Sequence, residues 1–205
     1  MRETKNILPT QEKKVSFEKE NIVNSSSSSL SSKEINPLDP DEKKINLAIS
    51  KYLFKRLDMN NDMCPSEFDI LNEDKHPVDS VFFKQISEKE IFNFVRKFQK
   101  ISWADPISLI LGIIFLKKLL EKHQNIPFNR ATWKRLFIGS VVLGLKIWSD
   151  YSIYLLDFQD RLDLPFLKIK SLYQIEYKFL SLLNFEVEWA PSDYEKTLVE
   201  FGFSF

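Results

Sequence analysis

The sequence predicts an all-α protein, and three observations lead to that fold class. Apolar residues recur at helical spacing over most of residues 41–201. Helix start signals, including capping boxes, precede several of these segments. No segment alternates apolar and polar residues between hairpin turns, which is the pattern typical of strands. Eighteen Phe against four Gly also favour large side chains packed between helices.

Composition narrows the class of protein. Lys and Arg together number 29, as do Asp and Glu, so net charge offers no global attraction to nucleic acid or to an anionic membrane. The single cysteine, Cys64, excludes an intramolecular disulfide and favours an intracellular compartment, cytoplasmic, nuclear or both. No secretory signal, membrane-spanning stretch or N-terminal myristoylation glycine is evident, so no membrane anchor is expected.

Residues 1–40 are predicted to be a disordered, serine-rich tail, because they are polar and include the run SSSSSLSS. Two interpretations of the run stay open. It can serve as a flexible linker, or phosphorylation can add charge and recruit or repel a partner. The candidate phosphorylation sites are Ser25, Ser26, Ser27, Ser28, Ser29, Ser31 and Ser32.

Residues 41–85 are predicted to form an N-terminal helix and a polar connection. Asp39-Pro40-Asp41 gives a start signal, and the helix then carries an apolar stripe at i+4 spacing. The connection after it contains two prolines, and its His76 is expected to be solvated rather than catalytic. The stripe consists of Ile45, Ile49, Leu53 and Leu57.

Residues 86–187 are predicted to hold five helices. The first opens at the capping box of Ser87 and Glu90 and carries Ile91, Phe94, Val95 and Phe98 on one face. The others are expected at about 105–123, with Pro106 in the first turn, and at about 129–149, 151–158 and 165–185. Residues 188–205 are predicted to add a C-terminal helix, opened by a capping box of Ser192 and Glu195 and reaching about Phe201.

The helix at about 129–149 is predicted to be the central one. Between Leu136 and Trp148 only Ser140 and Lys146 are polar, so nearly every side of the helix is apolar. Three glycines lie inside apolar helices, at positions 112, 139 and 144, and each costs about 1 kcal/mol relative to Ala in an exposed helix. Close approach of a neighbouring helix is the expected compensation.

No catalytic arrangement is evident, so neither an enzyme nor a cofactor is predicted. No glycine-rich loop precedes a helix to bind phosphate. The two histidines, His76 and His123, have no carboxylate or cysteine at metal-ligand spacing, so no metal site is expected. Cys64 lacks a histidine partner, and the acidic residues are expected on solvated faces, with Glu176 as the exception.

Lys146 and Glu176 are charges on apolar faces. Glu176 shares a stripe with Leu172, Leu180 and Leu183 on the predicted fifth helix. Because a buried charge is costly unless it is paired, the two side chains are expected to lie near each other. Either they form an internal salt bridge that fixes helix register, or both reach a surface and bind a partner's backbone groups.

Several motifs resemble those of a cyclin box. These are WKRL (133–136), KIWSD (146–150), DF (157–158) and LLNFEV (182–187), with NEDKHP (72–77) ahead of them. The resemblance spans about residues 44–202. Within the cyclins, the sequence is similar to the cyclin Y branch and to the fungal phosphate-regulon cyclins. It implies a cyclin-box fold, with five helices around a central third one, an N-terminal flanking helix and a short C-terminal helix.

The same resemblance implies a function. Lys146 and Glu176 match the lysine and glutamate with which cyclins contact a cyclin-dependent kinase and position its C-helix, with Trp148, Asp150, Leu172 and Leu180 as possible interface support. A kinase of the PFTAIRE/PCTAIRE type is the expected partner, with 14-3-3 binding a phosphorylated tail. No nucleic acid partner is expected.

Three departures from the family pattern keep alternatives open. Arg96 matches a cyclin arginine whose acidic partner is replaced here by Lys117. The segment FVRKF (94–98) departs from the substrate-docking motif of cell-cycle cyclins, and the myristoylated start of cyclin Y is not seen. A second box is not expected either. The alternatives are a transcription-factor-IIB-like module that binds DNA and polymerase, and a cyclin-like scaffold that does not activate a kinase.

Overall fold

The computed structural model describes residues 40–78, 86–150, 152–158 and 167–204. The serine run of the predicted tail lies outside the described residues. The described residues form six α-helices and two 3-10 helices without a strand, so the all-α prediction is confirmed. In chain order these are α1 (Pro40–Arg56), η1 (Ser66–Leu71), α2 (Glu88–Ser102), α3 (Pro106–Lys122), α4 (Trp133–Trp148), η2 (Leu155–Phe158), α5 (Ile169–Leu182) and α6 (Pro191–Glu200).

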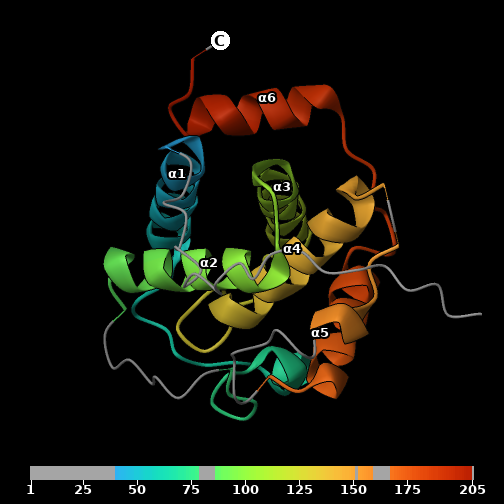
Figure 1. The fold of residues 1–205 in the computed structure, drawn as a ribbon. Helices are drawn as coiled ribbons and strands as arrows, with labels where there is room; N and C mark the ends of the chain where they lie inside the picture. Colours follow the sequence, from blue (N-terminus) through green and yellow to red (C-terminus); the bar gives the residue numbers. More distant parts are fainter. Residues whose placement is uncertain (1–39, 79–85, 151, 159–166, 205) are drawn as a thin grey trace, which may run out of the picture. The chain divides into compact units, whose positions relative to one another are not determined.

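Helix α4 is the centre of the bundle, as predicted, with α3 and α5 packed on either side of it (Figure 1). All its residues from Trp133 to Leu145 are buried. Helix α2 covers its first half through aromatic side chains. The Phe94 ring meets Trp133 edge-on with centroids 5.2 Å apart, and it meets Phe137 in the same way at 6.2 Å. Together with α3 and α5, these contacts bury α4 along its first three turns.

Two glycines let α3 and α4 approach backbone to backbone. A Cβ atom on Gly144 would overlap the carbonyl oxygen of Ser108 and lie 2.8 Å from the Gly112 nitrogen. On another side of α4, a Cβ on Gly139 would lie 3.0 Å from Ile175 Cγ2 of α5. The predicted close approach at all three helical glycines is therefore confirmed.

The predicted starts of α2 and α3 are also confirmed. Ser87 donates its N–H to Glu90 Oε2 at 2.6 Å, and Ser87 Oγ accepts the N–H of Glu90 at 3.3 Å. Asp105 Oδ1 accepts the N–H of Ser108 at 2.8 Å, with Pro106 next in the chain. Each cap satisfies donors that the first helical turn leaves without partners.

The predicted start of the central helix, at about residue 129, is wrong by four residues. Asn129 Oδ1 accepts the N–H of Ala131 at 2.9 Å, and Thr132 Oγ1 accepts the N–H of Asn129 at 3.2 Å. These side chains offer the backbone an alternative to helical hydrogen bonds, so residues 129–132 form a turn.

The two elements after α4 are shorter than predicted. The described part of the fourth helix is a 3-10 turn, Leu155–Phe158, and the fifth helix begins at Ile169. Tyr151 and Pro165, the predicted first residues of these helices, lie outside the described residues. The inward stripe of α5 is confirmed at Leu172, Ile175 and Phe179. Leu183 beyond the helix is also buried, whereas Leu182 is only half-buried.

The predicted capping box of α6 is wrong. Helix α6 starts at Pro191, so Ser192 already lies inside it. Asp193 Oδ2 instead accepts the N–H of Ala190, the residue before the helix, at 3.1 Å. Lys118 Nζ of α3 lies 3.2 Å from the same oxygen.

Replacing Asp193 by alanine is expected to lower the free energy of unfolding by about 1 kcal/mol at neutral pH, because the helix start loses its acceptor. The N–H of Ala190, and secondarily Lys118, hold the pKa of the Asp193 carboxyl below its ordinary value. Its stabilisation is therefore present above the ordinary pKa of about 4 and is lost as pH falls through the lower folded value.

Urea unfolding of both proteins at pH 7 and at about pH 3 checks this, since the difference between them should shrink in acid. Asp193→Asn, which keeps an acceptor but no charge, serves as the control. A penalty for alanine that is equal at both pH values would contradict the role of the carboxylate.

Candidate functional site

Lys146 and Glu176 meet at the surface between α4 and α5. Lys146 Nζ lies 2.5 Å from Glu176 Oε1. The Lys146 side chain is 30% exposed and that of Glu176 is 12% exposed. The pair is thus an ion pair between helices and also borders solvent, so both interpretations of the sequence pattern describe part of the geometry.

The packing of the two helices explains where the pair lies. Burial along α4 ends at Leu145, so Lys146 is the first residue of that helix to reach solvent. On α5, Ile175 packs against Gly139 of α4. Since successive helical residues are turned by about 100°, Glu176 projects beside that contact and not into it.

Exposed aromatic side chains lie on the two helices that carry the ion pair and just after α5, and sequence reasoning missed three of them. Tyr173 lies three residues before Glu176, so it is a neighbour of Glu176 on α5, and Tyr177 lies one turn beyond Tyr173 at the edge of that face. The two tyrosines are 47% and 68% exposed. Phe185, 58% exposed, packs edge-on against Tyr177 with ring centroids 6.3 Å apart. The sequence feature that could have revealed them is the presence of aromatic residues on α5 outside its buried stripe. We call Lys146, Trp148, Tyr173, Glu176, Tyr177 and Phe185 the paired-charge face.

The backbone at Phe185 is strained. Asn184 and Phe185 have φ values of 55° and 60°, in the left-handed region that a bulky side chain rarely adopts. The Phe185 N–H donates to the Leu180 carbonyl at 2.9 Å, which ends α5 and leaves the ring exposed. Strain of this kind costs of order 1–3 kcal/mol and is concentrated at functional sites.

The four residues expected to support an interface differ in their access to solvent. Trp148 is 40% exposed and meets Trp189 edge-on, with centroids 6.5 Å apart. Asp150 is exposed and Leu180 is half-buried. Leu172 is 1% exposed, so it can support the face only from the core, by holding α5 in place.

A second charge cluster lies in the core, where the sequence predicted none. Lys134 Nζ lies 2.8 Å from Glu73 Oε1, with side chains 4% and 9% exposed. Arg135 donates to the carbonyl oxygens of Ile70, at 2.6 Å, and His76, at 2.7 Å. Burial lowers the pKa of the Arg135 guanidinium to about 10. The expectation that acidic residues other than Glu176 are solvated is therefore wrong for Glu73.

This cluster assigns a structural role to two motifs that resemble those of cyclins. The basic residues of WKRL hold the segment NEDKHP against α4, and the Ala131 carbonyl accepts the N–H of Glu73 at 2.6 Å. The predicted polar connection is therefore partly a core element, and Phe68 and Leu71 of η1 are buried with it. His76 itself is exposed, as expected.

Lys117 does not pair within the bundle. Its Nζ lies 2.5 Å from Glu200 Oε2 on α6, so the residue that replaces the family's acidic one fastens the C-terminal helix. Arg96 Nε is buried and has no hydrogen-bond partner among the described residues. The replacement of the acidic partner of Arg96 by Lys117, noted in the sequence, is thus visible in the structure.

The described residues offer neither a metal site nor a membrane-spanning helix. No group of three or more His, Cys, Asp and Glu side chains there is arranged to hold a metal ion. Among the same residues, no helix is both long and apolar enough to cross a bilayer.

Comparison with known proteins identifies the family. A family model described as Cyclin matches residues 10–187, which is most of the sequence and ends just before α6. The chain belongs to the cyclin family. Cyclins are regulatory rather than catalytic proteins, so membership implies a regulatory role and, in general, a kinase partner. No solved structure matches the chain.

Proposed function

We propose that this chain is a cyclin of the cyclin Y type that binds and activates a cyclin-dependent kinase through the paired-charge face. The observation that carries the proposal is the Lys146–Glu176 ion pair, which is 2.5 Å long and borders solvent on two helices that also expose aromatic residues. The residue pattern and the family match agree with it. The kinase expected is one of the PFTAIRE/PCTAIRE type.

The pair keeps hydrogen-bonding capacity that a partner can use. An ammonium group has three donors and a carboxylate has several acceptor positions, and one contact between them uses a fraction of these. Hydrogen bonds to charged groups are stronger than neutral ones, above all when an interface excludes water. The pair already holds the two side chains in position, so a partner's backbone groups would meet them with little further loss of side-chain entropy.

The exposed aromatic residues of the paired-charge face suit the core of such an interface. Protein interfaces are enriched in Tyr, Trp and Phe, and a few such residues carry most of the binding energy. Tyr177 and Phe185 are more than half exposed in the free chain, so binding would bury a large apolar area on both. The strained backbone of Phe185 keeps its ring available for this contact.

The mechanism is a shift in kinase population. A partner that binds the active arrangement of the kinase C-helix more tightly than the inactive one raises the share of active kinase. The active arrangement brings the kinase's own Lys–Glu ion pair together, which phosphoryl transfer requires. The cyclin performs no chemistry in this account.

Exchanging the two charges separates an internal salt bridge from a binding site. The variant Lys146→Glu/Glu176→Lys retains an ion pair but presents the opposite charges to a partner. We expect it to stay helical, with nearly unchanged stability, and to lose kinase recovery in affinity purification by at least about tenfold, as for the loss of interface anchors. Unchanged recovery would show that the pair has only an internal role.

The ion pair of Lys117 and Glu200 provides the matched control, because it has the same length and joins α3 to α6 instead. Lys117→Ala/Glu200→Ala should leave kinase recovery intact. Measuring kinase activity in the recovered complexes tests the scaffold alternative, since binding without stimulation would favour it. No observation on the described residues favours the transcription-factor-IIB-like alternative. Retention on DNA that weakens as the salt concentration rises would support it.

The remaining expectations form part of the same proposal. The domain boundaries are a tail over 1–40, a flanking helix and connection over 41–85, a box over 86–187 and a C-terminal helix over 188–205. Phosphorylation of the tail serines and 14-3-3 binding belong to the proposed regulation.

A further inference from the structure

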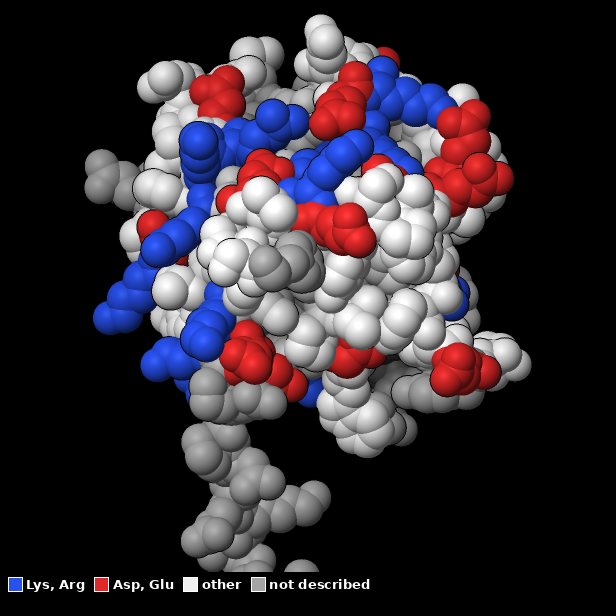
Figure 2. All heavy atoms as spheres, turned by 90° about the horizontal axis from the view of Figure 1, so that it is seen from above, with Lys and Arg blue, Asp and Glu red and all other residues white. Residues whose placement is uncertain are grey.

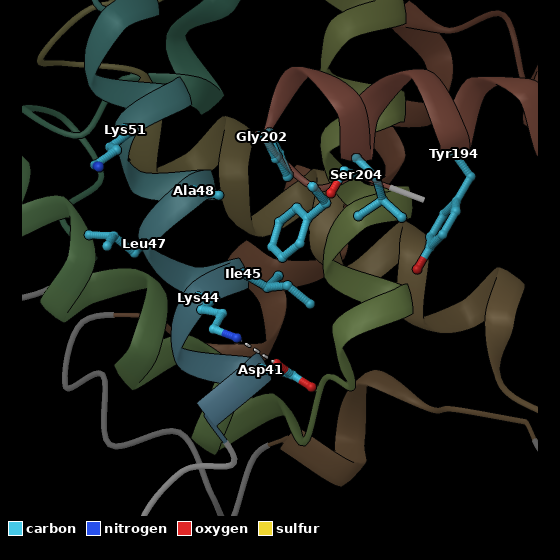
Figure 3. A pocket seen from close by; sticks show the side chains of 12 residues that line it. Asp41, Lys44, Ile45, Leu47, Ala48, Lys51, Tyr194, Gly202 and Ser204 are labelled. Carbon is cyan, nitrogen blue, oxygen red and sulfur yellow. Dashed lines mark hydrogen bonds and ion pairs between the residues drawn. The ribbon is translucent and has the colours of Figure 1, made fainter.

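A groove separate from the paired-charge face lies between α1 and α6 (Figure 3). It has a volume of about 670 Å³. Ile45, Leu47 and Ala48 of α1 line one side, and Leu198 and Phe203 line the other. Leu47 is 40% exposed, so the groove offers an apolar wall that solvent reaches.

A specific helix ending shapes the second wall. At the end of α6 the chain reverses at Gly202, whose φ of +84° suits glycine. Phe203 donates its N–H to the Leu198 carbonyl at 3.0 Å, and Gly202 donates to Val199 at 2.9 Å, which is the Schellman arrangement. The reversal returns Phe203 to the groove. A Cβ on Gly202 would have no neighbour within 4 Å, so the space beside it is open.

The rim of the groove on α1 is basic. Lys44 and Lys51 line the groove and are exposed. Lys55 lies one turn beyond Lys51, outside the groove, and continues the same side of the helix. Lys44 is paired with Asp41 at 3.2 Å, but Lys51 and Lys55 make no ion pair with any described residue. Figure 2 shows Lys and Arg side chains along the side of the molecule where Figure 1 places α1, with carboxylates between them.

The groove and the paired-charge face share no helix. The groove is built by α1 and α6, and the ion pair by α4 and α5. In Figure 1, α1 lies on the far side of α3 from α5. A ligand in the groove therefore leaves the paired-charge face open.

We propose that this groove is a second docking site, which binds an acidic segment of a partner protein through one or two large apolar side chains. The apolar walls would take those side chains. The ammonium group of Lys51 in the groove, with that of Lys55 one turn beyond it, would attract carboxylates beside them. A chain that held a kinase at one face could hold a substrate or regulator of that kinase at the other.

Peptide selection tests the proposal and requires no candidate partner protein. The full chain is used to select from a display library of random 12-residue peptides, and enriched peptides are labelled with fluorescein and titrated. We expect acidic peptides that contain Phe, Leu or Trp, with binding that weakens as salt screens the charges. Lys51→Glu and Leu47→Ala should each weaken binding about tenfold, or 1.4 kcal/mol.

Three controls make the outcomes distinct. Lys170→Glu reverses an exposed lysine on α5, outside the groove, and should not change peptide binding. The exchange Lys146→Glu/Glu176→Lys should not change it either, so loss of kinase binding and loss of peptide binding can be told apart. Light scattering at increasing concentration checks whether a second copy occupies the groove.

Selection of no acidic peptides would overturn the proposal, as would peptides that bind Lys51→Glu and wild type equally. A dimer that Leu47→Ala abolishes would overturn it as well, because the groove would then be an interface between copies of this chain.

Discussion

Replacing Glu73 by alanine is expected to lower the free energy of unfolding by about 3–5 kcal/mol. Glu73 is the acidic partner of Lys134, at 2.8 Å, and that lysine side chain is only 4% exposed. Without the carboxylate, an ammonium group in the core loses the counter-charge that Glu73 supplies, and burial then penalises it more heavily. The Glu73 segment would also release Arg135, which donates to carbonyl oxygens on either side of it. Urea denaturation followed by circular dichroism measures the effect.

Asp69→Ala is the matched control. Asp69 pairs with Lys75 at 2.7 Å, but the two side chains are 40% and 53% exposed, so its loss should cost less than about 1 kcal/mol. The double replacement Glu73→Met/Lys134→Met removes both buried charges and should be less destabilising than Glu73→Ala alone. Equal losses for Glu73→Ala and Asp69→Ala would show that burial does not govern the Glu73 pair.

Replacing Gly144 by alanine is expected to destabilise the bundle by about 1–3 kcal/mol, although alanine favours helix formation. The added Cβ would overlap the Ser108 carbonyl oxygen and meet the Gly112 backbone, neither of which can rotate away as a flexible side chain could. The helices α3 and α4 would have to separate. Since Lys146 lies half a turn further along α4, the change should also weaken kinase recovery.

Thermal unfolding checks this prediction against Ser181→Ala. Ser181 is exposed on α5, so alanine there should be neutral or slightly stabilising. If Gly144→Ala behaved like Ser181→Ala, the close approach of α3 and α4 would not be needed for stability.

Helical periodicity predicted the bundle because the burial of one face of each helix is what imposes an apolar repeat on the sequence. The stripe on α1 and the apolar faces of α2 and α5 all point inward in the structure. Helix α4, which the sequence shows as apolar on nearly every side, is central, and its first thirteen residues are all buried. Caps were predicted correctly where one side chain and one nearby N–H decide the outcome, as at Ser87 and Asp105. The starts of α4 and α6 were missed because Asn129 and Asp193 compete with the expected caps through equally local bonds.

The candidate site was only partly accessible from the sequence. Charges on apolar stripes predicted that Lys146 and Glu176 lie together, because unpaired charges there would be costly. The pair of Glu73 and Lys134 joins a loop to a helix 61 positions away, and no periodicity marks a loop residue as buried. The groove could not be predicted, since it depends on how α6 crosses α1 and on the reversal at Gly202.

The abrupt end of burial on α4 limits how this chain can diversify. From Trp133 to Leu145 every side chain is enclosed, so nearly any substitution there changes the packing of the bundle. Beyond Leu145 the helix has only Lys146, Ile147 and Trp148 left, and these reach the surface. A relative that acquired a different partner through α4 would have to do so with that single last turn, while the rest of the helix stayed almost unchanged.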